Sequence, residues 1–183
     1  MTKYRAYRIF SAQANNVSAL MSLFAAIESD DNSSIELTPV VVFLAFSIEA
    51  YLNALGDRHI PNWSELERLP WRKKIAMLYQ AANTTPNWET QPLEFAAEMF
   101  SIRDKLAHGK PERVVGKLRD TNAEAWEDVE VLQPDWILNI TKSWVTNAGH
   151  RFHALMIHMA NMFGEKEDDY LLHSVGSVTP LDA

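Results

Sequence analysis

The sequence contains no cysteine among its 183 residues. This absence excludes disulfide bonds, thiolate metal sites and thiol chemistry, and it fits a reducing compartment. Glycine is scarce too, with six scattered residues that form no phosphate-binding loop. The HExxH and GxSxG patterns of zinc and serine hydrolases are also missing. We therefore expect neither a metal site nor a cofactor.

Long hydrophobic segments are missing as well. The longest apolar run covers residues 39–46, far short of the ~20 residues that cross a bilayer. Polar residues rather than an apolar segment follow the first charges, so we expect no signal peptide. A chain of this length without a break in composition favours one domain over residues 1–183. We expect a cytoplasmic protein that does not enter a membrane.

Positive charge is scarce overall but concentrated in one stretch. The net charge of −7 disfavours a protein that binds nucleic acid chiefly by electrostatics. Residues 103–119 carry six basic and two acidic side chains, so this stretch is +4 and the rest of the chain is −11. Residues 120–135 carry six acidic side chains and no lysine or arginine. The two stretches are either solvated faces or an anion site beside an acidic, partner-facing segment.

Hydrophobic periodicity predicts an all-α protein, a helical bundle of about five main helices. The expected helices cover residues 3–29, 38–56, 64–82 with an interruption at Pro70, 93–107 and 134–163. The second helix is apolar almost all round, so we expect it at the centre, packed against the fourth. Between the last two helices we expect a short hairpin around 114–115 and 129–132, and after them a frayed tail over 164–183.

Two groups of side chains suggest sites but are better explained by packing. His150, His153 and His158 share one helix, where the third lies about 140° from the second, so the three cannot converge on a metal. The six tryptophans could stack on nucleic-acid bases. They are spread over four segments rather than along one face, which favours packing roles.

Glu49 and Asn53 are polar residues inside the apolar 38–56 helix. They lie four residues apart and therefore share one helix face. Polar groups in apolar surroundings need partners. We expect Glu49 to be buried and paired, either with Arg103 or with a nearby backbone or hydroxyl donor.

A short motif ends the helix predicted over 93–107: Arg103 and Asp104 are followed by His108 and then Gly109. By itself this spacing is weak evidence, because a histidine in a last helical turn also stabilises the helix dipole. Together with the upstream sequence FLAFSIEAYLNAL, however, it resembles the HEPN family. Those α-helical bundles carry an arginine, a polar residue, three variable residues and a histidine. The resemblance covers roughly residues 38–163, with the first helix and the tail as additions.

The resemblance implies a metal-independent endoribonuclease, often a toxin or a defence protein. In that chemistry the ribose 2′-OH attacks the adjacent phosphorus and leaves a 2′,3′-cyclic phosphate and a 5′-OH. A histidine suits the proton transfers, here His108. An arginine suits the charge on phosphorus, here Arg103. The supporting residues would be Asp104, Glu49 and Asn53, and the RNA-binding residues Lys105, Lys110 and Arg113.

Helix geometry adds a constraint. Residues five apart diverge by about 140° on a regular helix, so one site would most simply combine Arg103 and His108 from two chains. We therefore expect a homodimer whose interface includes the 93–108 helix, as the resemblance also implies. The competing hypothesis is a non-catalytic HEPN interaction module that binds a nucleotidyltransferase-like antitoxin or another protein. Overall acidity favours that hypothesis, and the +4 stretch favours the nuclease.

Overall fold

Helices dominate the computed structural model, which describes residues 3–29, 36–171 and 175–181. The all-α expectation is confirmed, since the only sheet in the described ranges is a two-stranded ribbon. The helices are α1 (Ala12–Ser29), α2 (Thr38–His59), α3 (Trp63–Leu66), α4 (Trp71–Ala81), α5 (Leu93–His108), α6 (Asn122–Val131), α7 (Asp135–Leu138), α8 (Lys142–Asn161) and the short 3-10 helix η1 (Asp169–Leu171). The ribbon pairs β1 (Lys3–Ile9) with β2 (Val175–Leu181).

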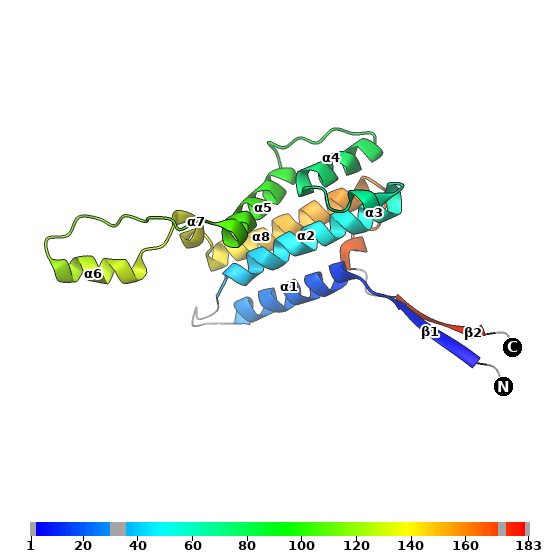
Figure 1. Cartoon of the computed structure of the whole chain (residues 1–183), viewed down its shortest axis with the longest axis horizontal. Coiled ribbons are helices and arrows are strands. Elements are labelled where there is room, and N and C mark those ends of the chain that lie inside the picture. Colours follow the sequence, from blue (N-terminus) through cyan, green and yellow to red (C-terminus); the bar gives the residue numbers. More distant parts are fainter. Residues whose placement is uncertain (1–2, 30–35, 172–174, 182–183) are drawn as a thin grey trace.

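The bundle is built around α2, which packs against α1, α4, α5 and α8 (Figure 1). The predicted packing of α2 against α5 is therefore confirmed. Leu44, Ile48, Leu52 and Leu55 are fully buried along α2, and Phe95, Met99 and Phe100 of α5 join the same core. By length and composition α2 could cross a membrane, but most of it is buried inside the bundle, as in the core helix of a soluble protein.

The expectation that α2 ends at Gly56 is wrong, because the helix continues to His59 and Gly56 lies inside it. A Cβ atom at this position would lie 2.1 Å from Cε2 of the Trp63 ring. The buried indole of Trp63 packs directly on the helix backbone, and only glycine leaves room for it. The residue therefore serves close packing between α2 and α3 rather than helix termination.

The two ends of the chain pair with each other, which corrects two expectations. Residues 3–9 are a strand instead of the first turns of a helix, and α1 begins at Ala12. The tail, expected to be frayed, contributes the antiparallel partner, with Tyr7 opposite Ser177. Tyrosine, valine and threonine favour strands. The ribbon extends away from the bundle (Figure 1).

The segment between α5 and α8 forms a second projection (Figure 1). The expected hairpin is wrong, because residues 122–131 form α6. Thr121 and Glu124 form a reciprocal capping box that starts this helix. The expected last helix is divided into α7 and α8, since Thr141 caps a new helix by accepting from the Trp144 amide at 3.2 Å. We call residues 109–134 the arm.

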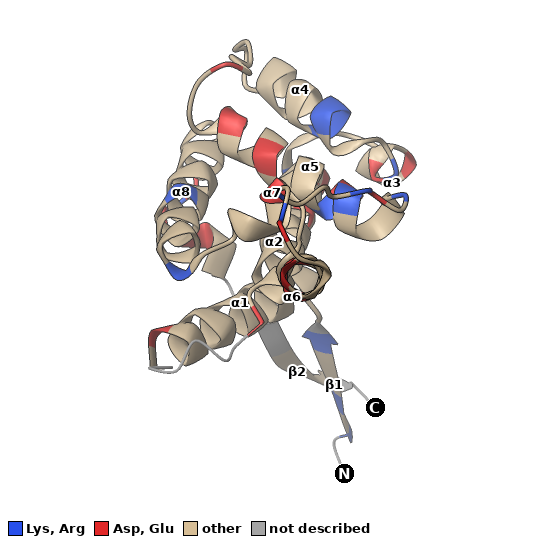
Figure 2. Cartoon of the chain, turned by 90° about the vertical axis from the view of Figure 1, so that its left-hand side faces the viewer, with Lys and Arg blue, Asp and Glu red and all other residues tan. Residues whose placement is uncertain are grey.

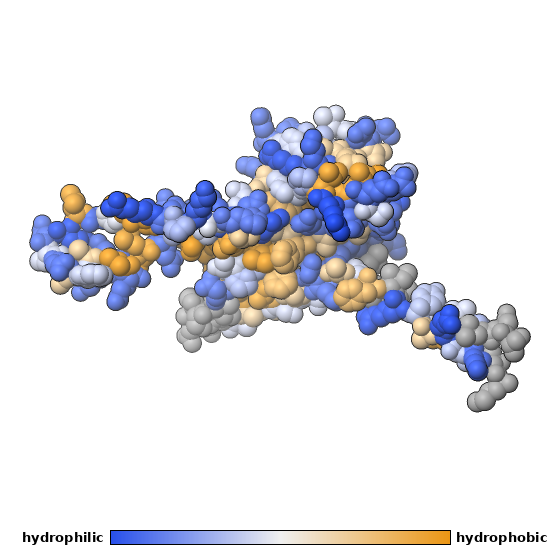
Figure 3. Space-filling view, in the orientation of Figure 1, coloured by the Kyte–Doolittle hydropathy of each residue, from blue (hydrophilic) through white to orange (hydrophobic). Residues whose placement is uncertain are grey.

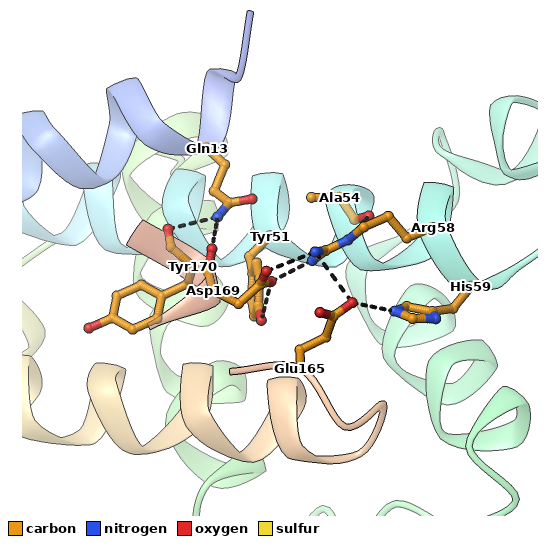
Figure 4. A network of polar contacts seen from close by, with 8 residues as sticks. All are labelled: Gln13, Tyr51, Ala54, Arg58, His59, Glu165, Asp169 and Tyr170. Atoms are coloured by element: carbon orange, nitrogen blue, oxygen red, sulfur yellow. Dashed lines mark hydrogen bonds and ion pairs between the residues drawn. The ribbon is translucent and has the colours of Figure 1, made fainter. Parts of the chain in front are cut away.

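A polar network around the buried Asp169 attaches the C-terminal segment to α1 and α2 (Figure 4). Arg58 donates to both carboxylate oxygens of Asp169, and the Tyr51 hydroxyl donates to Asp169 Oδ2 at 3.0 Å. Gln13 Nε2 donates to the Tyr170 carbonyl at 2.7 Å. Glu165 lies 3.4 Å from Arg58 and 2.9 Å from His59. We call these residues the clamp, because they join segments from both ends of the chain.

Candidate functional site

Arg103 and His108 line one shallow groove between α2 and the end of α5. The groove has a volume of about 400 Å³, and the rest of its lining is apolar: Val42, Phe46, Leu106 and Ala107. The α5 helix remains regular up to His108, which is exposed in its last turn. The structure thus brings the two motif residues to one open surface without unwinding the helix.

The Arg103 guanidinium is held by carboxylates on two sides. Its Nη1 lies 3.1 Å from Asp104 Oδ1, and its Nη2 lies 3.7 Å from Glu49 Oε2. The Arg103 Cζ also lies 5.4 Å from the centre of the Phe100 ring, an attractive position for a cation. These contacts orient the side chain, and the pairing with Glu49 is the longer of its two carboxylate contacts.

Glu49 is paired as expected, but it is not buried. Its side chain is 34% exposed, and besides Arg103 it accepts a hydrogen bond from Lys74 Nζ at 2.9 Å. The buried member of the pair is Lys74, whose side chain is 2% exposed. Because an isolated buried ammonium is costly, the Glu49 carboxylate must balance Lys74 as well as orient Arg103.

Lys74 is a residue of this cluster that sequence reasoning missed. A signal for it exists, since Lys74 falls on the same α4 stripe as the apolar residues Trp71, Ile75 and Leu78. A charged residue on an apolar stripe predicts a buried ion pair. The groove residues Val42 and Phe46 were also missed, because their neighbours in the sequence give no sign that these two apolar side chains lie outside the core.

Asn53, one turn from Glu49, contributes a different feature. Its Oδ1 is buried without a hydrogen-bond partner among the described residues, as is Nε of Arg103. Buried polar atoms are nearly always paired. Two of the expected site residues therefore have a buried polar atom whose hydrogen-bonding capacity the protein itself does not use.

The three expected RNA-binding residues do not line the groove of Arg103 and His108. Lys105 and Lys110 line a second hollow of about 470 Å³ at the base of the arm, together with Glu112 and Trp136. Arg113 is exposed further along the arm. Any RNA bound by all of them would have to follow the surface from the groove onto the arm.

Two of the three histidines of α8 have separate partners. His153 Nδ1 lies 2.7 Å from the Tyr170 hydroxyl, and His158 Nε2 lies 2.6 Å from the Tyr79 hydroxyl. Burial lowers the pKa of His158. Over the described ranges, no group of three or more metal-ligating side chains is close enough together to hold an ion.

No family model, curated protein or solved structure matches this chain. The motif residues and the geometry of the groove are therefore the features of this chain that bear on its function.

Proposed function

We propose that this protein is a HEPN-like endoribonuclease that cleaves RNA without a metal ion, with His108 and Arg103 in the site. The observation that carries the proposal is that both side chains, five residues apart on one helix, line the same open groove. The Arg103 guanidinium is oriented but not enclosed. An arginine and a histidine facing one solvent-accessible space suit phosphoryl chemistry.

Each residue has a defined part in the reaction. The ribose 2′-oxygen forms a bond to phosphorus and loses its proton, while the bond to the 5′-oxygen breaks and that oxygen gains a proton. His108 serves one of these proton transfers. Arg103 binds the phosphate oxygens that become more negative in the transition state. Asp104 and Glu49 hold Arg103 in position, and Lys105, Lys110 and Arg113 attract the RNA backbone.

The active form is a homodimer whose interface includes α5. Arg103 and His108 diverge along the helix, and a two-fold contact between the exposed ends of α5 would supply each site with a second set of both residues. Phe46, which is 46% exposed beside the groove, provides apolar surface for such a contact.

The test is incubation of the purified protein with a structured RNA in EDTA. The proposal expects fragments that end in 2′,3′-cyclic phosphate and begin with 5′-OH, and loss of these products in His108→Ala and Arg103→Ala. His150→Ala is the matched control, because His150 is another exposed histidine but lies on α8 beside a different hollow. Cleavage by His108→Ala at the wild-type rate, or cleavage only with a divalent ion, would contradict the mechanism.

The alternative function is a non-catalytic module that binds a nucleotidyltransferase-like antitoxin or another protein. The exposed apolar side chains of the arm favour this alternative, since such surfaces mark protein contacts. A wild-type protein that cleaves no RNA while it captures a protein partner through the arm would support it.

A further inference from the structure

The ribbon formed by the two ends of the chain carries basic side chains and no acidic ones. Its strand β1 contains Lys3, Arg5 and Arg8, and β2 contains no charged residue. The first acidic residue of the sequence is Glu28, although the whole chain has a net charge of −7. Figure 2 shows the basic residues of β1 in blue. The ribbon is therefore a local excess of positive charge on an acidic protein.

These side chains are available to a molecule outside the chain. All three basic side chains of β1 are exposed, and within the described residues none of them makes a hydrogen bond, an ion pair or a contact with an aromatic ring. Tyr4 and Tyr7 are 66% and 53% exposed. In the space-filling view of Figure 3 the ribbon stands clear of the bundle, with hydrophilic side chains along it. Unlike Arg58 and Arg103, which pair with carboxylates, the arginines of the ribbon have their donors free within the described part of the chain.

Strand geometry gathers part of this chemistry on one face of the ribbon. Successive side chains of a strand point to opposite faces, so Lys3, Arg5 and Tyr7 share one face. Residues directly opposite each other on paired strands also share a face. Ser177 lies opposite Tyr7. Thr179 lies opposite Arg5. We call these five residues the basic face.

The basic face has the composition of a surface that binds single-stranded nucleic acid. Such surfaces combine basic side chains that follow the phosphate backbone with aromatic rings on which bases stack. Lys3 and Arg5 lie about 6.8 Å apart along the strand, at ~3.4 Å per residue. The next position on that face is Tyr7, whose ring is exposed. The hydroxyl groups of the face add hydrogen-bond donors of the kind that contact phosphate and sugar oxygens.

Charge decides between the two kinds of occupant that a ribbon could have. An open strand edge can pair with a strand of another chain. Two copies of this ribbon, however, would bring only basic and no acidic side chains together, and like charges side by side destabilise a sheet. A nucleic acid instead releases a counterion for each phosphate that a basic side chain neutralises. The ribbon therefore favours a polyanion over a second copy.

The ribbon lies at the other end of the bundle from the groove (Figure 1). Phe46, in the first half of α2, lines the groove, whereas Arg58, in its last turn, holds the segment that leads to β2. With 22 residues, α2 is ~33 Å long at 1.5 Å per residue. An RNA on the ribbon therefore leaves the groove and the end of α5 open, and a longer RNA reaches both.

We infer that the ribbon is a second RNA-binding element, whose basic face holds single-stranded RNA while another part of the same strand lies in the groove. Lys3 and Arg5 bind phosphates, and Tyr7 stacks on a base. This inference rests on the proposed function for its ligand, but binding to the ribbon does not require cleavage. Because one contact makes the other intramolecular, the ribbon should raise the affinity for long RNA and not for short RNA.

The first test measures the salt dependence of binding. The probe is a fluorescent 2′-O-methyl RNA, which lacks the attacking hydroxyl, of about 30 nucleotides, longer than α2 at ~3.4 Å per nucleotide. By anisotropy, Lys3→Gln/Arg5→Gln should reduce the slope of log K against log salt concentration by about 1.4, since each phosphate contact to a single strand contributes ~0.7. The control Arg68→Gln/Lys73→Gln also removes one exposed arginine and one exposed lysine, but far from the ribbon in sequence. Equal slopes for the two double variants would overturn the inference.

The second test asks whether a base stacks on the basic face. Tyr7→Ser should weaken binding at least about fivefold, as the loss of one stacked base does, and Tyr7→Phe should retain the affinity. Tyr4→Ser makes the same change on the opposite face of the strand and should bind like the wild type. An equal loss in the two serine variants would contradict stacking on this face. Poly-glutamate that displaces the RNA as well as unlabelled RNA does would assign the ribbon to an acidic protein surface instead.

Cleavage assays separate this inference from the proposed nuclease. Lys3→Gln/Arg5→Gln should raise the KM for long RNA with kcat unchanged. Cleavage of a substrate of about four nucleotides, ~14 Å long, should not change. A wild type that cleaves RNA, with ribbon variants that bind RNA normally, would remove the ribbon site and leave the nuclease standing. Binding that depends on the basic face, in a protein that cleaves no RNA, would support the ribbon site and remove the nuclease.

Discussion

Two clusters of charged side chains lie along α2, and they use their charges differently. In the clamp, the Asp169 carboxylate is buried and accepts three side-chain hydrogen bonds from Arg58 and Tyr51. In the candidate site, Glu49 is half-buried, its contact with Arg103 is 3.7 Å long, and His108 is exposed. In the clamp, Arg58 and Tyr51 of the same chain occupy both oxygens of the Asp169 carboxylate, whereas in the candidate site the His108 side chain is exposed to solvent.

This difference suggests a way to separate stabilising from functional charge. The Arg58 guanidinium, through its hydrogen bonds, holds the pKa of Asp169 below its ordinary value of 3.8, and burial raises the pKa of Tyr51. Strongly perturbed groups often mark functional sites. Here they mark the attachment of the C-terminal segment, because Asp169 comes from that segment while Arg58 and Tyr51 belong to α2.

The largest expected effect is on RNA cleavage. His108→Ala and Arg103→Ala should each lower the rate by about 10²–10⁴-fold, and the double variant should lose less than the product of the two effects, because both residues act on one transition state. The melting temperature of His108→Ala should stay near that of the wild type, since His108 is exposed. Single-turnover kinetics and thermal melts measure both quantities. A large loss of stability in His108→Ala would show that the histidine stabilises the fold instead of taking part in cleavage.

Substitution in the clamp should have the opposite profile. Asp169→Ala leaves Arg58 and Tyr51 without their acceptor and should lower the free energy of unfolding by roughly 2–4 kcal/mol. This is less than the full cost of breaking a buried pair, because the Arg58 side chain is one-third exposed. Urea denaturation gives the value. A variant as stable as the wild type would show that the C-terminal segment contributes little to the bundle.

The Glu49–Lys74 pair should respond asymmetrically. Glu49→Ala leaves the buried Lys74 ammonium alone and should cost roughly 1–3 kcal/mol. Lys74→Met should cost less than about 1 kcal/mol, because Glu49 is partly solvated and keeps Arg103 nearby. The double variant should recover most of the stability lost in Glu49→Ala, as a double-mutant cycle by urea denaturation will show. A double variant that loses the sum of the two single costs would mean that Lys74 does not depend on Glu49.

The smallest expected effect is in the acid dependence of stability. Since the folded pKa of Asp169 is depressed, its contribution is complete above the unfolded value and is lost as the pH falls below about 3.8 toward the folded value. The difference in melting temperature between the wild type and Asp169→Asn should therefore shrink between pH 5 and pH 3. A difference that stays constant over this range would show that the carboxylate charge is not what stabilises the clamp.

The hydrophobic pattern of the sequence predicted the helices of the bundle but not the terminal ribbon or α6. The apolar residues of α2, α5 and α8 follow helical spacing, so those segments were predictable from neighbours in the sequence. The strand at residues 3–9 was not, because its partner lies about 170 residues away and strand pairing has no local signature of its own. The hairpin expected near 129–132 failed for a different reason: the capping box at Thr121 and Glu124 was present in the sequence and was overlooked.

The candidate site shows the same division. Arg103, Asp104 and His108 could be found from their spacing, and Glu49 from its polarity in an apolar helix. Lys74 was detectable only by asking why a lysine falls on an apolar stripe. Phe46 could not be found at all, since an exposed phenylalanine on a core helix has the same sequence signature as a buried one.

By itself, the sequence determined the helical class, the central position of α2 and the placement of an arginine and a histidine near the end of α5. These properties depend on side-chain periodicity, helix termini and composition, all of which act between near neighbours. Only the tertiary structure decided that Lys74 is the buried partner of Glu49, that Asp169 attaches the C-terminal segment to Arg58, and that the arm projects with Trp126 exposed. Each of these depends on which distant segments come into contact, and burial and ion pairing are properties of those contacts rather than of the residues alone.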